Sequence, residues 1–389
     1  MEKECRILYT APRYHTNQVP IMHGWHNRGC KVMFMATFVG ISEVHDDVEF
    51  HLLKKSWISK LLFKHIDKKY DANRVEWKKV CSFIPAIRDT ARKIKAFQPD
   101  IVIMRERVLP NAVIYFICRM LGIKNVIQYV QTPIADGVFN DNAIKRRIQK
   151  LLFPKVVFSP IDYNGKNRQQ RIVDNVYFVP LISESTDVYK KAYFKNQKIN
   201  FLLVGKYRDV KNHFFLVDVF ERLRHRLDLS GVKLTMMGEV ANDSENEYYQ
   251  KLEAYIHEKK LEDVIELQGS LPFEQMSEYY LDFDVLLLPS TSESAGMVIL
   301  EAMEKGLCVA SSIYCGLSCY LEKYQCGYTY DIRQPEELTD LLTKLIHNPN
   351  KIEEMGRKSC QVIREHLLFK NYEKALNELT EKEFGYTFY

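Results

Sequence analysis

The sequence lacks any apolar run long enough to cross a lipid bilayer. The longest runs, such as residues 111–117 and 285–289, fall far short of the ~20 residues that a membrane-spanning helix needs. Residues 1–6 carry charges of both signs and lead directly into an apolar segment, which is not the pattern of a secretory signal. We therefore expect a cytoplasmic protein without a spanning helix.

Paired cysteines are also missing. The nine cysteines are scattered along the chain, no two of them are spaced as Cys-x-x-Cys, and Cys315 and Cys319 are too isolated to form a zinc site. These features argue against a disulfide framework or a zinc module, and they predict reduced, buried thiols.

A large excess of charge of one sign is absent as well, because the formal net charge is only +5. The charge is distributed unevenly, however: residues 1–190 hold 31 Lys and Arg against 18 Asp and Glu, whereas residues 191–389 hold 24 against 32. A basic half suits nucleic acid, an anionic membrane or a phosphorylated substrate. No zinc finger, RNA-binding aromatic motif or recognition-helix pattern accompanies it, so nucleic acid is not an expected partner.

The length of 389 residues, with 46% hydrophobic and 27% charged residues, predicts two globular domains. Short apolar strands alternate with helical segments in both halves, which is typical of an α/β protein with parallel sheets covered on both faces. We expect one domain over residues 1–185, completed by a helix over 370–389, and a second over 186–369, joined by the polar segment 180–198.

The expected strands cover residues 6–10, 31–37, 100–104, 125–130, 156–160, 176–180, 200–204, 232–237, 264–268, 285–289 and 308–311. The expected helices cover residues 110–121, 212–227, 244–260, 273–281, 297–305 and 371–383.

Residues 289–303 read Pro-Ser-Thr-Ser-Glu-Ser-Ala-Gly-Met-Val-Ile-Leu-Glu-Ala-Met and form the most informative segment. The pattern predicts a strand, a loop of small residues and a helix that begins near Gly296. Free amides at a helix start bind anions, and glycine lets a ligand approach the backbone closely. Glu293 and Glu301 would repel a phosphate, so they are better suited to accept hydrogen bonds from the hydroxyl groups of a sugar ring and a ribose.

A second segment, residues 205–212, reads Gly-Lys-Tyr-Arg-Asp-Val-Lys-Asn and also lies between a predicted strand and a predicted helix. Lys206 and Lys211 can neutralise a diphosphate, whose departure with negative charge is the difficult part of glycosyl transfer. The two lysines would remove the need for a metal ion, and no metal or cofactor is expected. Asp282 and Asp284 resemble an Asp-x-Asp metal motif, but they precede a buried strand, where turn and cap chemistry is the simpler interpretation.

Together the two segments resemble the retaining GT-B glycosyltransferases of family four (glycosyl transferases group 1). That family carries Glu-x7-Glu in the context Pro-Ser-x-x-Glu-x-x-Gly-x-x-x-x-Glu-Ala-Met, which residues 289–303 match. The resemblance covers residues 200–365 well and the first half only in outline. It implies a GT-B fold, in which two Rossmann-like domains face a deep cleft.

The resemblance also implies roles for single residues. Glu293 would contact the donor sugar, Lys206 and Lys211 would stabilise the leaving diphosphate, and Glu301 would hold the ribose. The other donor-binding residues would be Gly205, Gly238, Glu239, Gly269, Ser270, Leu271, Ser294, Ala295, Gly296, Met297 and Val298. Gly238 can equally be a simple strand end.

The sequence departs from the family pattern at several positions. Lys206 replaces an arginine, and Ala295 stands where an aromatic residue is common, so no sugar preference carries over. Gln131 occupies the aligned position at which a histidine often follows a strand, and His15 is the candidate substitute. The expected acceptor-binding residues are Arg13, Tyr14, His15, Arg105, Arg107 and Gln131. For Arg105 and Arg107 a surface salt bridge is the alternative to an acceptor phosphate.

The function that these residues predict is metal-independent transfer of a hexose-type sugar, with retention, from a UDP- or GDP-sugar to a saccharide or lipid-linked acceptor. The expected context is assembly of bacterial surface polysaccharide, lipopolysaccharide or capsule. Residues 51–70 mix lysines with large apolar residues, which suits either peripheral binding at the inner face of an anionic membrane or packing of the helix on its own domain. A nucleotide-sugar epimerase of the same fold and a non-catalytic nucleotide-sugar-binding protein remain the alternatives.

Overall fold

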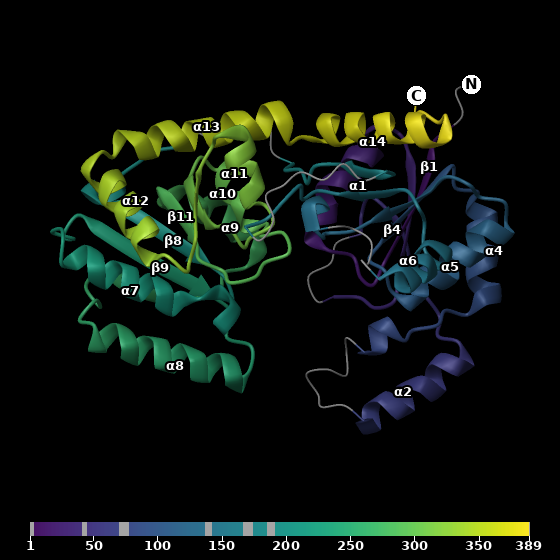
Figure 1. Cartoon of the computed structure of the whole chain (residues 1–389), viewed down its shortest axis with the longest axis horizontal. Coiled ribbons are helices and arrows are strands. Elements are labelled where there is room, and N and C mark those ends of the chain that lie inside the picture. Colours follow the sequence, from purple (N-terminus) through teal and green to yellow (C-terminus); the bar gives the residue numbers. More distant parts are fainter. Residues whose placement is uncertain are drawn as a thin grey trace. The chain divides into compact units, whose positions relative to one another are not determined.

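The computed structural model describes residues 4–40, 45–69, 78–136, 142–165, 174–184 and 191–388. The chain divides into two compact units. Figure 1 shows the elements of both, in colours that follow the sequence. Unit 1 comprises residues 1–162, 170–182 and 369–389, and unit 2 comprises residues 163–169 and 183–368. The predicted domain boundary between residues 185 and 186 lies outside the described residues.

Unit 1 contains one parallel sheet in the order β3-β2-β1-β4-β5-β6-β7. Its strands are β1 (Arg6–Ala11), β2 (Lys31–Ala36), β3 (Glu49–Leu52), β4 (Ile101–Arg105), β5 (Val126–Tyr129), β6 (Val157–Ser159) and β7 (Val176–Phe178). The α-helices are α1 (Val19–Asn27), α2 (Trp57–Lys69), α4 (Ile87–Phe97), α5 (Leu109–Met120), α6 (Ala143–Leu152) and α14 (Phe369–Phe384), with 3-10 turns η1 (Thr16–Gln18) and η2 (Ile134–Asp136).

Unit 2 contains a second parallel sheet, in the order β10-β9-β8-β11-β12-β13. Its strands are β8 (Ile199–Val204), β9 (Val232–Gly238), β10 (Ile265–Gly269), β11 (Val285–Leu288), β12 (Cys308–Ser312) and β13 (Tyr328–Tyr330). The α-helices are α7 (His213–Arg224), α8 (Asp243–Glu258), α9 (Phe273–Tyr279), α10 (Val298–Glu304), α11 (Ser318–Tyr324), α12 (Pro335–His347) and α13 (Asn350–His366), with 3-10 turns η3 (Lys195–Gln197), η4 (Asp209–Lys211) and η5 (Tyr280–Asp282).

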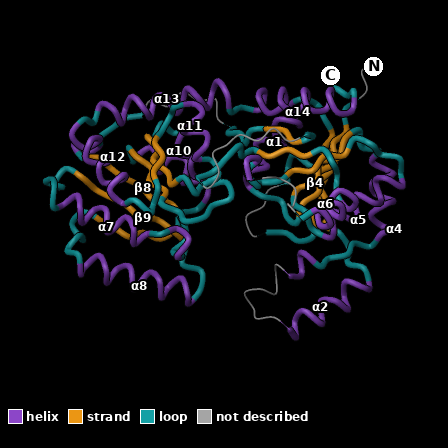
Figure 2. The backbone as a smooth tube through the Cα atoms, viewed as in Figure 1, coloured by secondary structure: helices purple, strands orange, loops and turns teal. Residues whose placement is uncertain are grey.

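In each unit the strands lie in the middle and the helices outside them (Figure 2), as a parallel sheet requires. Strand β11 is therefore apolar and buried along its whole length. Alternate residues of β1 enter different cores: Ile7 and Tyr9 pack into one hydrophobic cluster and Leu8 into another, because successive side chains of a strand point to opposite faces.

Helix α14 is part of unit 1 although it lies at the end of the chain. Its Tyr372 hydroxyl is 3.0 Å from that of Tyr9, which in turn accepts a hydrogen bond from the Trp25 indole. A Cβ atom on Gly24 would come within 2.0 Å of the Phe369 ring, so helix α1 needs glycine there to admit α14.

The structure corrects several sequence expectations. The segment between the first two strands, for which no element was expected, forms helix α1. Residues 51–70 are not one amphipathic segment, because His51 and Leu52 belong to strand β3 and helix α2 begins at Trp57. Strand β4 extends to Arg105, one residue beyond the prediction. The sequence did not delineate strands β3 and β13 or helices α2, α4, α6, α11, α12 and α13. Part of the predicted linker 180–198, including Ser185, lies outside the described residues.

Candidate functional site

The strand order of each sheet reverses at one point, and loops diverge there at the carboxyl ends of the strands. In unit 2 the reversal lies between β8 and β11, and the loops that leave these strands are the two segments that the sequence singled out, 205–212 and 289–297. In unit 1 it lies between β1 and β4. Ligands of doubly wound α/β folds bind at such points.

Lys211 and Glu293 join the two loops of unit 2, because the Lys211 ammonium donates a hydrogen bond to the Glu293 carboxylate. Their side chains are 17% and 26% exposed. Two further hydrogen bonds link the same loops: the Thr291 amide donates to the Val210 carbonyl at 2.9 Å, and the Asn212 side-chain amide donates to the Pro289 carbonyl at 3.2 Å. The predicted sugar-binding carboxylate and a predicted diphosphate-binding lysine are therefore neighbours.

Lys206 lies on the same loop but is ion-paired with Glu239 at 2.5 Å. The two side chains are 43% and 48% exposed, so water and salt screen this pair strongly. The structure thus pairs each predicted lysine with a carboxylate from the predicted donor set.

Two glycines of the predicted donor set have steric roles. A Cβ atom on Gly238 would lie 2.1 Å from the Gly205 carbonyl oxygen, so glycine is needed for β8 and β9 to end side by side. Gly296 has φ = +82°, a conformation that glycine adopts without strain. It allows the chain to turn from the Glu293 loop into α10.

Backbone amides of residues that follow β12 hold the loop between β11 and α10 in place. The Gly316 amide donates to the Glu293 carbonyl at 2.9 Å, and the Leu317 amide donates to the Ala295 carbonyl at 2.8 Å. Within the part of the chain that the structure describes, the amides of Ala295, Gly296 and Met297 have no hydrogen-bond acceptor. These N–H groups, next to the start of α10 at Val298, suit an anionic ligand.

Glu301 points from the first turn of α10 to Tyr280, whose hydroxyl donates to a Glu301 carboxylate oxygen at 2.8 Å. Burial raises the pKa of the Glu301 carboxyl, and the Tyr280 hydrogen bond partly opposes this shift. The Tyr280 side chain is only 1% exposed, so it fixes the carboxylate from the protein side. Nothing in the sequence motif indicated Tyr280.

The sequence also did not indicate roles for Tyr207, which lies within the segment 205–212, and His213, which follows it. The buried Tyr207 hydroxyl donates to the carbonyls of Met236 at 2.7 Å and Gln268 at 2.8 Å, and its ring stacks on His213. Burial lowers the pKa of His213 to about 3, so this imidazole is neutral at pH 7. A sequence signal for them did exist, because an aromatic residue within a lysine-containing turn indicates that the turn packs against the core.

Four other predicted donor residues lie at the end of strand β10, just after it, or before α10, without a marked environment. Gly269 ends β10, and a Cβ atom there would meet nothing within 4 Å. Ser270 and Ser294 are exposed, and Leu271 is half-buried. The structure places these residues on the loops at the carboxyl edge of the sheet.

Asp282 and Asp284 have structural partners. The buried Asp284 carboxylate accepts hydrogen bonds from the amides of Phe194 at 2.9 Å and Asn200 at 2.8 Å, and Asp282 is ion-paired with Lys195. Their environments agree with the turn and cap interpretation.

The switch point of unit 1 is built around a buried arginine. Arg105, at the end of β4, is 4% exposed, and one of its Nη atoms donates to the side-chain oxygens of Asn17 at 3.0 Å and Gln18 at 3.3 Å. The guanidinium lies 5.4 Å from the centre of the Tyr129 ring, and its Nε atom is 3.8 Å from Glu106. A surface salt bridge, one of the two interpretations of Arg105, is therefore wrong, because the side chain is buried.

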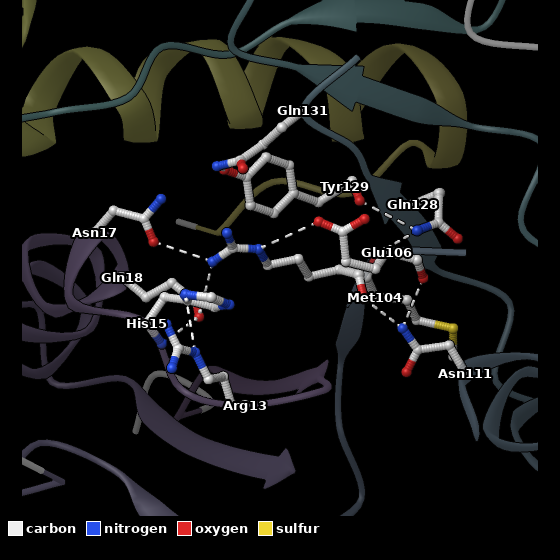
Figure 3. Close-up of polar contacts among 11 residues, drawn as sticks. Arg13, His15, Asn17, Gln18, Met104, Glu106, Asn111, Gln128, Tyr129 and Gln131 are labelled. Carbon is white, nitrogen blue, oxygen red and sulfur yellow. Dashed lines mark hydrogen bonds and ion pairs between the residues drawn. The ribbon is translucent and has the colours of Figure 1, made fainter. Parts of the chain in front are cut away.

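Figure 3 shows the side chains that surround this switch point, with His15, Asn17 and Gln18 from the loop after β1 facing Glu106, Tyr129 and Gln131. Asn111 fixes the β4 end, since its side chain donates to the carbonyls of Arg105 and Glu106 and accepts from the Thr10 hydroxyl.

Glu106 has φ = +69°, a strained backbone conformation for a residue other than glycine. Such strain is often found at functional sites, where the surrounding contacts hold it in place.

The other predicted acceptor residues differ in how available they are. Tyr14 is 3% exposed and packs against Phe34, so the structure places its ring in the core rather than at a binding surface. His15 accepts a hydrogen bond from Arg13 at Nδ1, and burial together with Arg105 and Arg13 lowers its pKa to about 3. A neutral imidazole of so low a pKa is a poor general base at pH 7.

Arg107 and Gln131 complete the predicted acceptor set. Burial lowers the pKa of Arg107 to about 10. The Gln131 side chain donates to the Tyr129 hydroxyl at 2.9 Å, and it stands where the family pattern has a histidine. An amide cannot take up a proton, so Gln131 offers hydrogen bonding only.

The fold and the switch points define a class: two α/β units of the kind found in GT-B glycosyltransferases. Residues 185–362 match the family described as glycosyl transferases group 1. Over this segment, which lies within unit 2, the match confirms the predicted resemblance to glycosyl transferases group 1, and transfer with retention stays a prediction.

Two curated relatives illustrate the likeness in sequence. D-inositol 3-phosphate glycosyltransferase of Paenarthrobacter aurescens (strain TC1) is 26% identical over 156 residues, 40% of this chain and 37% of the relative. The capsular polysaccharide biosynthesis glycosyltransferase CapH of Staphylococcus aureus is 26% identical over 119 residues, 31% of this chain and 32% of the relative. The matches span less than half the length of these curated relatives.

The structural likeness covers nearly the whole chain. Anabaena HepE, solved in complex with UDP, superposes with a TM-score of 0.67 over 98% of this chain and 100% of that chain, at 10% sequence identity. At so low an identity the superposition establishes the fold alone.

Proposed function

We propose that this protein is a glycosyltransferase that moves a hexose-type sugar from a nucleotide-diphosphate sugar to a saccharide or lipid-linked acceptor. The observation that carries the proposal is the Lys211–Glu293 ion pair across the switch point of unit 2. It brings a cation for a diphosphate and an acceptor for sugar hydroxyls to one place, as glycosyl transfer requires.

In the proposed donor complex the diphosphate takes over the Lys211 ammonium from Glu293. The freed Glu293 carboxylate then accepts hydrogen bonds from hydroxyls of the transferred sugar. The three open amides of Ala295, Gly296 and Met297 add neutral donors for the phosphate oxygens. Lys206 makes the same exchange from Glu239, with a smaller effect because it is more exposed.

Glu301, held by Tyr280, accepts hydrogen bonds from the ribose in this proposal. Its own burial disfavours the charged form, and ribose hydroxyl groups would offset part of that cost by hydrogen bonding to the carboxylate. The base would rest against the loop after Gly269, and UDP and GDP are the candidate nucleotides.

The reaction breaks the bond between the anomeric carbon and the diphosphate oxygen and forms a bond from that carbon to an acceptor hydroxyl oxygen. We propose that the acceptor attacks from the side of the leaving group, so that its proton passes to a departing phosphate oxygen and the configuration is retained. Lys206 and Lys211 stabilise the negative charge that develops there, which takes the role of a metal ion.

We place the acceptor at the switch point of unit 1. Arg105 is a permanent cation whose nearest hydrogen-bond acceptors, Asn17 and Gln18, are neutral side chains. An anionic group, such as the phosphate of a lipid carrier or a sugar phosphate, complements it. Arg13, Arg107 and Gln131 would supply further donors, and the neutral His15 would act as a hydrogen-bonding residue.

The family match of unit 2 and the capsule-related relative support a role in polysaccharide assembly. A UDP complex of a protein with the same fold supports a nucleotide-linked donor. Bacterial surface polysaccharide, built on a lipid carrier at the inner face of the membrane, is the proposed context.

The test is to incubate the protein with a panel of UDP- and GDP-sugars and to measure nucleotide release with and without EDTA. We expect one donor to be hydrolysed slowly, EDTA to have no effect, and Lys211→Ala to slow the release strongly. An epimerase would instead change the sugar without lasting loss of the anomeric bond, and a pure binding protein would show a thermal shift without turnover. Absence of both turnover and thermal shift with every donor would refute the proposal.

A further inference from the structure

Helices α5 and α6 of unit 1 carry large apolar side chains that face solvent. These residues, which define the α5–α6 face, are Phe116, Met120, Ile144, Ile148, Leu151 and Leu152, and their exposed fractions are 62%, 71%, 71%, 51%, 67% and 44%. The opposite side of α5 packs on its own domain, since Ile114 and Ile117 are buried in the core. So much exposed apolar surface in one place is unusual for a soluble protein and marks an interaction site.

The two helices enclose a groove of about 540 Å³, lined by Ala112, Tyr115, Phe116, Arg119, Met120, Leu151 and Leu152. Its lining is mainly apolar, and α5 and α6 are labelled side by side in Figure 1. The groove joins the exposed side chains of α5 to Leu151 and Leu152 of α6, and Ile144 and Ile148 lie further along the same helix.

Helix α6 is amphipathic, and its apolar stripe stays exposed to solvent. Ile144, Ile148 and Leu151 are spaced by four and three residues, which places them on one side of the helix. No residue of α6 whose burial is described is fully buried, so the helix does not use this stripe to pack on its own domain.

The charge of the face is of one sign. Lys145 and Arg147 of α6 flank the apolar stripe, Arg146 and Lys150 lie on the other side of the helix, and Arg119 of α5 borders the groove. Neither helix contains an aspartate or a glutamate. A basic, amphipathic helix with exposed isoleucine and leucine residues suits the interface of an anionic bilayer.

Self-association is disfavoured by the same charges. A two-fold symmetric contact between two α5–α6 faces would bring the basic side chains of one copy against those of the other, and like charges repel. Lipid phosphates offer opposite charge and an apolar layer at once. No helix among the described residues is long and apolar enough to span a bilayer, so contact from the surface is what the face can make.

We propose that the α5–α6 face docks this protein on an anionic lipid bilayer, with Ile144, Ile148 and Leu151 entering the interfacial layer and the basic residues of α6 contacting lipid phosphates. The inference does not rest on the proposed transferase activity. It differs from the expectation for residues 51–70. Helix α2 also exposes Trp57 and Leu61, but it carries Asp67, which is ion-paired with Lys79, whereas α5 and α6 carry no acidic residue and share an apolar groove.

The experiment measures co-sedimentation of the full chain with phosphatidylcholine vesicles that either contain or lack phosphatidylglycerol. We expect binding only to the anionic vesicles and a decrease with added salt. The variant Ile148→Ser with Leu151→Ser should bind at least about 10-fold more weakly, since each side chain contributes apolar area. The variant Lys145→Gln with Arg147→Gln should lose a similar factor, because these two cations flank the apolar stripe and would lie nearest the lipid phosphates.

The matched control is Trp57→Ser with Leu61→Ser in α2, which removes comparable apolar surface from another helix of unit 1. All substituted residues are exposed, and an unchanged thermal transition verifies that each variant folds. Equal binding to neutral and anionic vesicles, or loss of binding in the α2 variant and not in the α6 variants, would overturn the proposal. So would a dimer in solution that the α6 variants dissociate, since that result assigns the face to a second copy.

Discussion

The two switch points differ in how they hold positive charge. In unit 2 the lysines sit on loops, partly exposed, and each has a carboxylate partner, Lys211 with Glu293 and Lys206 with Glu239. In unit 1 the cation is a buried arginine at a strand end, and the hydrogen bonds from Arg105 go to neutral side-chain oxygens.

This difference suggests two modes of binding. A carboxylate–lysine pair can open so that each partner meets a different part of one ligand, and this suits a sugar diphosphate, which has hydroxyls at one end and charge at the other. A buried arginine fixed by amides cannot move far, and its charge is only partly balanced by Glu106 at 3.8 Å. It suits a single anionic group bound in a fixed position.

The largest expected effect is on turnover when the mobile cation of unit 2 is removed. We expect Lys211→Ala to lower kcat by about 10²- to 10³-fold, because a preorganised donor to the developing charge is lost. The measurement is steady-state transfer or donor hydrolysis. Lys351→Ala removes a lysine from another ion pair of unit 2, with Glu354, and should leave kcat unchanged. Similar rates for the two variants would mean that the lysine loop is not part of the site.

The second prediction separates the fixed cation from the mobile one. Arg105→Gln should lower kcat/KM for an acceptor that carries an anionic group by about 10- to 100-fold, the usual worth of a charge-assisted hydrogen bond. Donor affinity, measured by calorimetry, should stay constant. Arg105→Lys keeps the positive charge but lacks the planar guanidinium group, so it should recover part of the lost kcat/KM. A change in donor affinity alone would contradict the assignment of Arg105 to the acceptor.

The third prediction concerns a neutral histidine that supports the site of unit 2. The pKa of His213 is lowered to about 3 by burial, so the unfolded chain binds more protons than the folded one between about pH 3 and 6.5. Its contribution to the free energy of unfolding is therefore present above pH 6.5 and is lost as the pH falls towards 3. His213→Gln should flatten that dependence by up to about 1.4 kcal/mol per pH unit.

The slope is measured by denaturant unfolding at several pH values. His225→Gln, at an exposed position of the same unit, is the control and should keep the slope of the original chain. An identical slope for both variants and the original chain would show that His213 protonates freely in the folded state.

The smallest expected effect is at the ribose end of the donor site. Tyr280→Phe removes the hydrogen bond to Glu301 and should raise the Kd for the nucleotide by about 3- to 10-fold. The adjacent Tyr279→Phe, whose hydroxyl donates to Gln268 instead, is the matched control. If nucleotide affinity responds equally to both substitutions, Tyr280 has only a packing role.

The sequence was most informative where local pattern and function coincide. The strand–loop–helix segments around Lys211 and Glu293 were recognisable because continuous apolar runs mark buried parallel strands and because the motif spacing is specific. Unit 1 was harder: its strand β3 has no fully buried residue, so it gave no clear pattern. The helix α1 was missed because Gly24 and two histidines blur its periodicity.

Several site residues could not be found from the sequence, because their roles depend on contacts between distant segments. Tyr280 meets Glu301 across 21 positions, and Arg105 meets Asn17 across 88. The sequence left Arg105 between two interpretations because burial of a charged side chain is decided by the packing of the whole sheet. For the same reason the sequence did not show that Tyr14, an expected acceptor-binding residue, is buried in the core.

By itself the sequence determined the class of fold and the identity of the charged groups in unit 2, since strand periodicity and loop composition are local properties. The tertiary structure alone decided which charges pair, which are buried, and which apolar side chains stay exposed. The physical reason is that charge pairing and burial depend on distances between segments, and those distances exist only once the two sheets have formed.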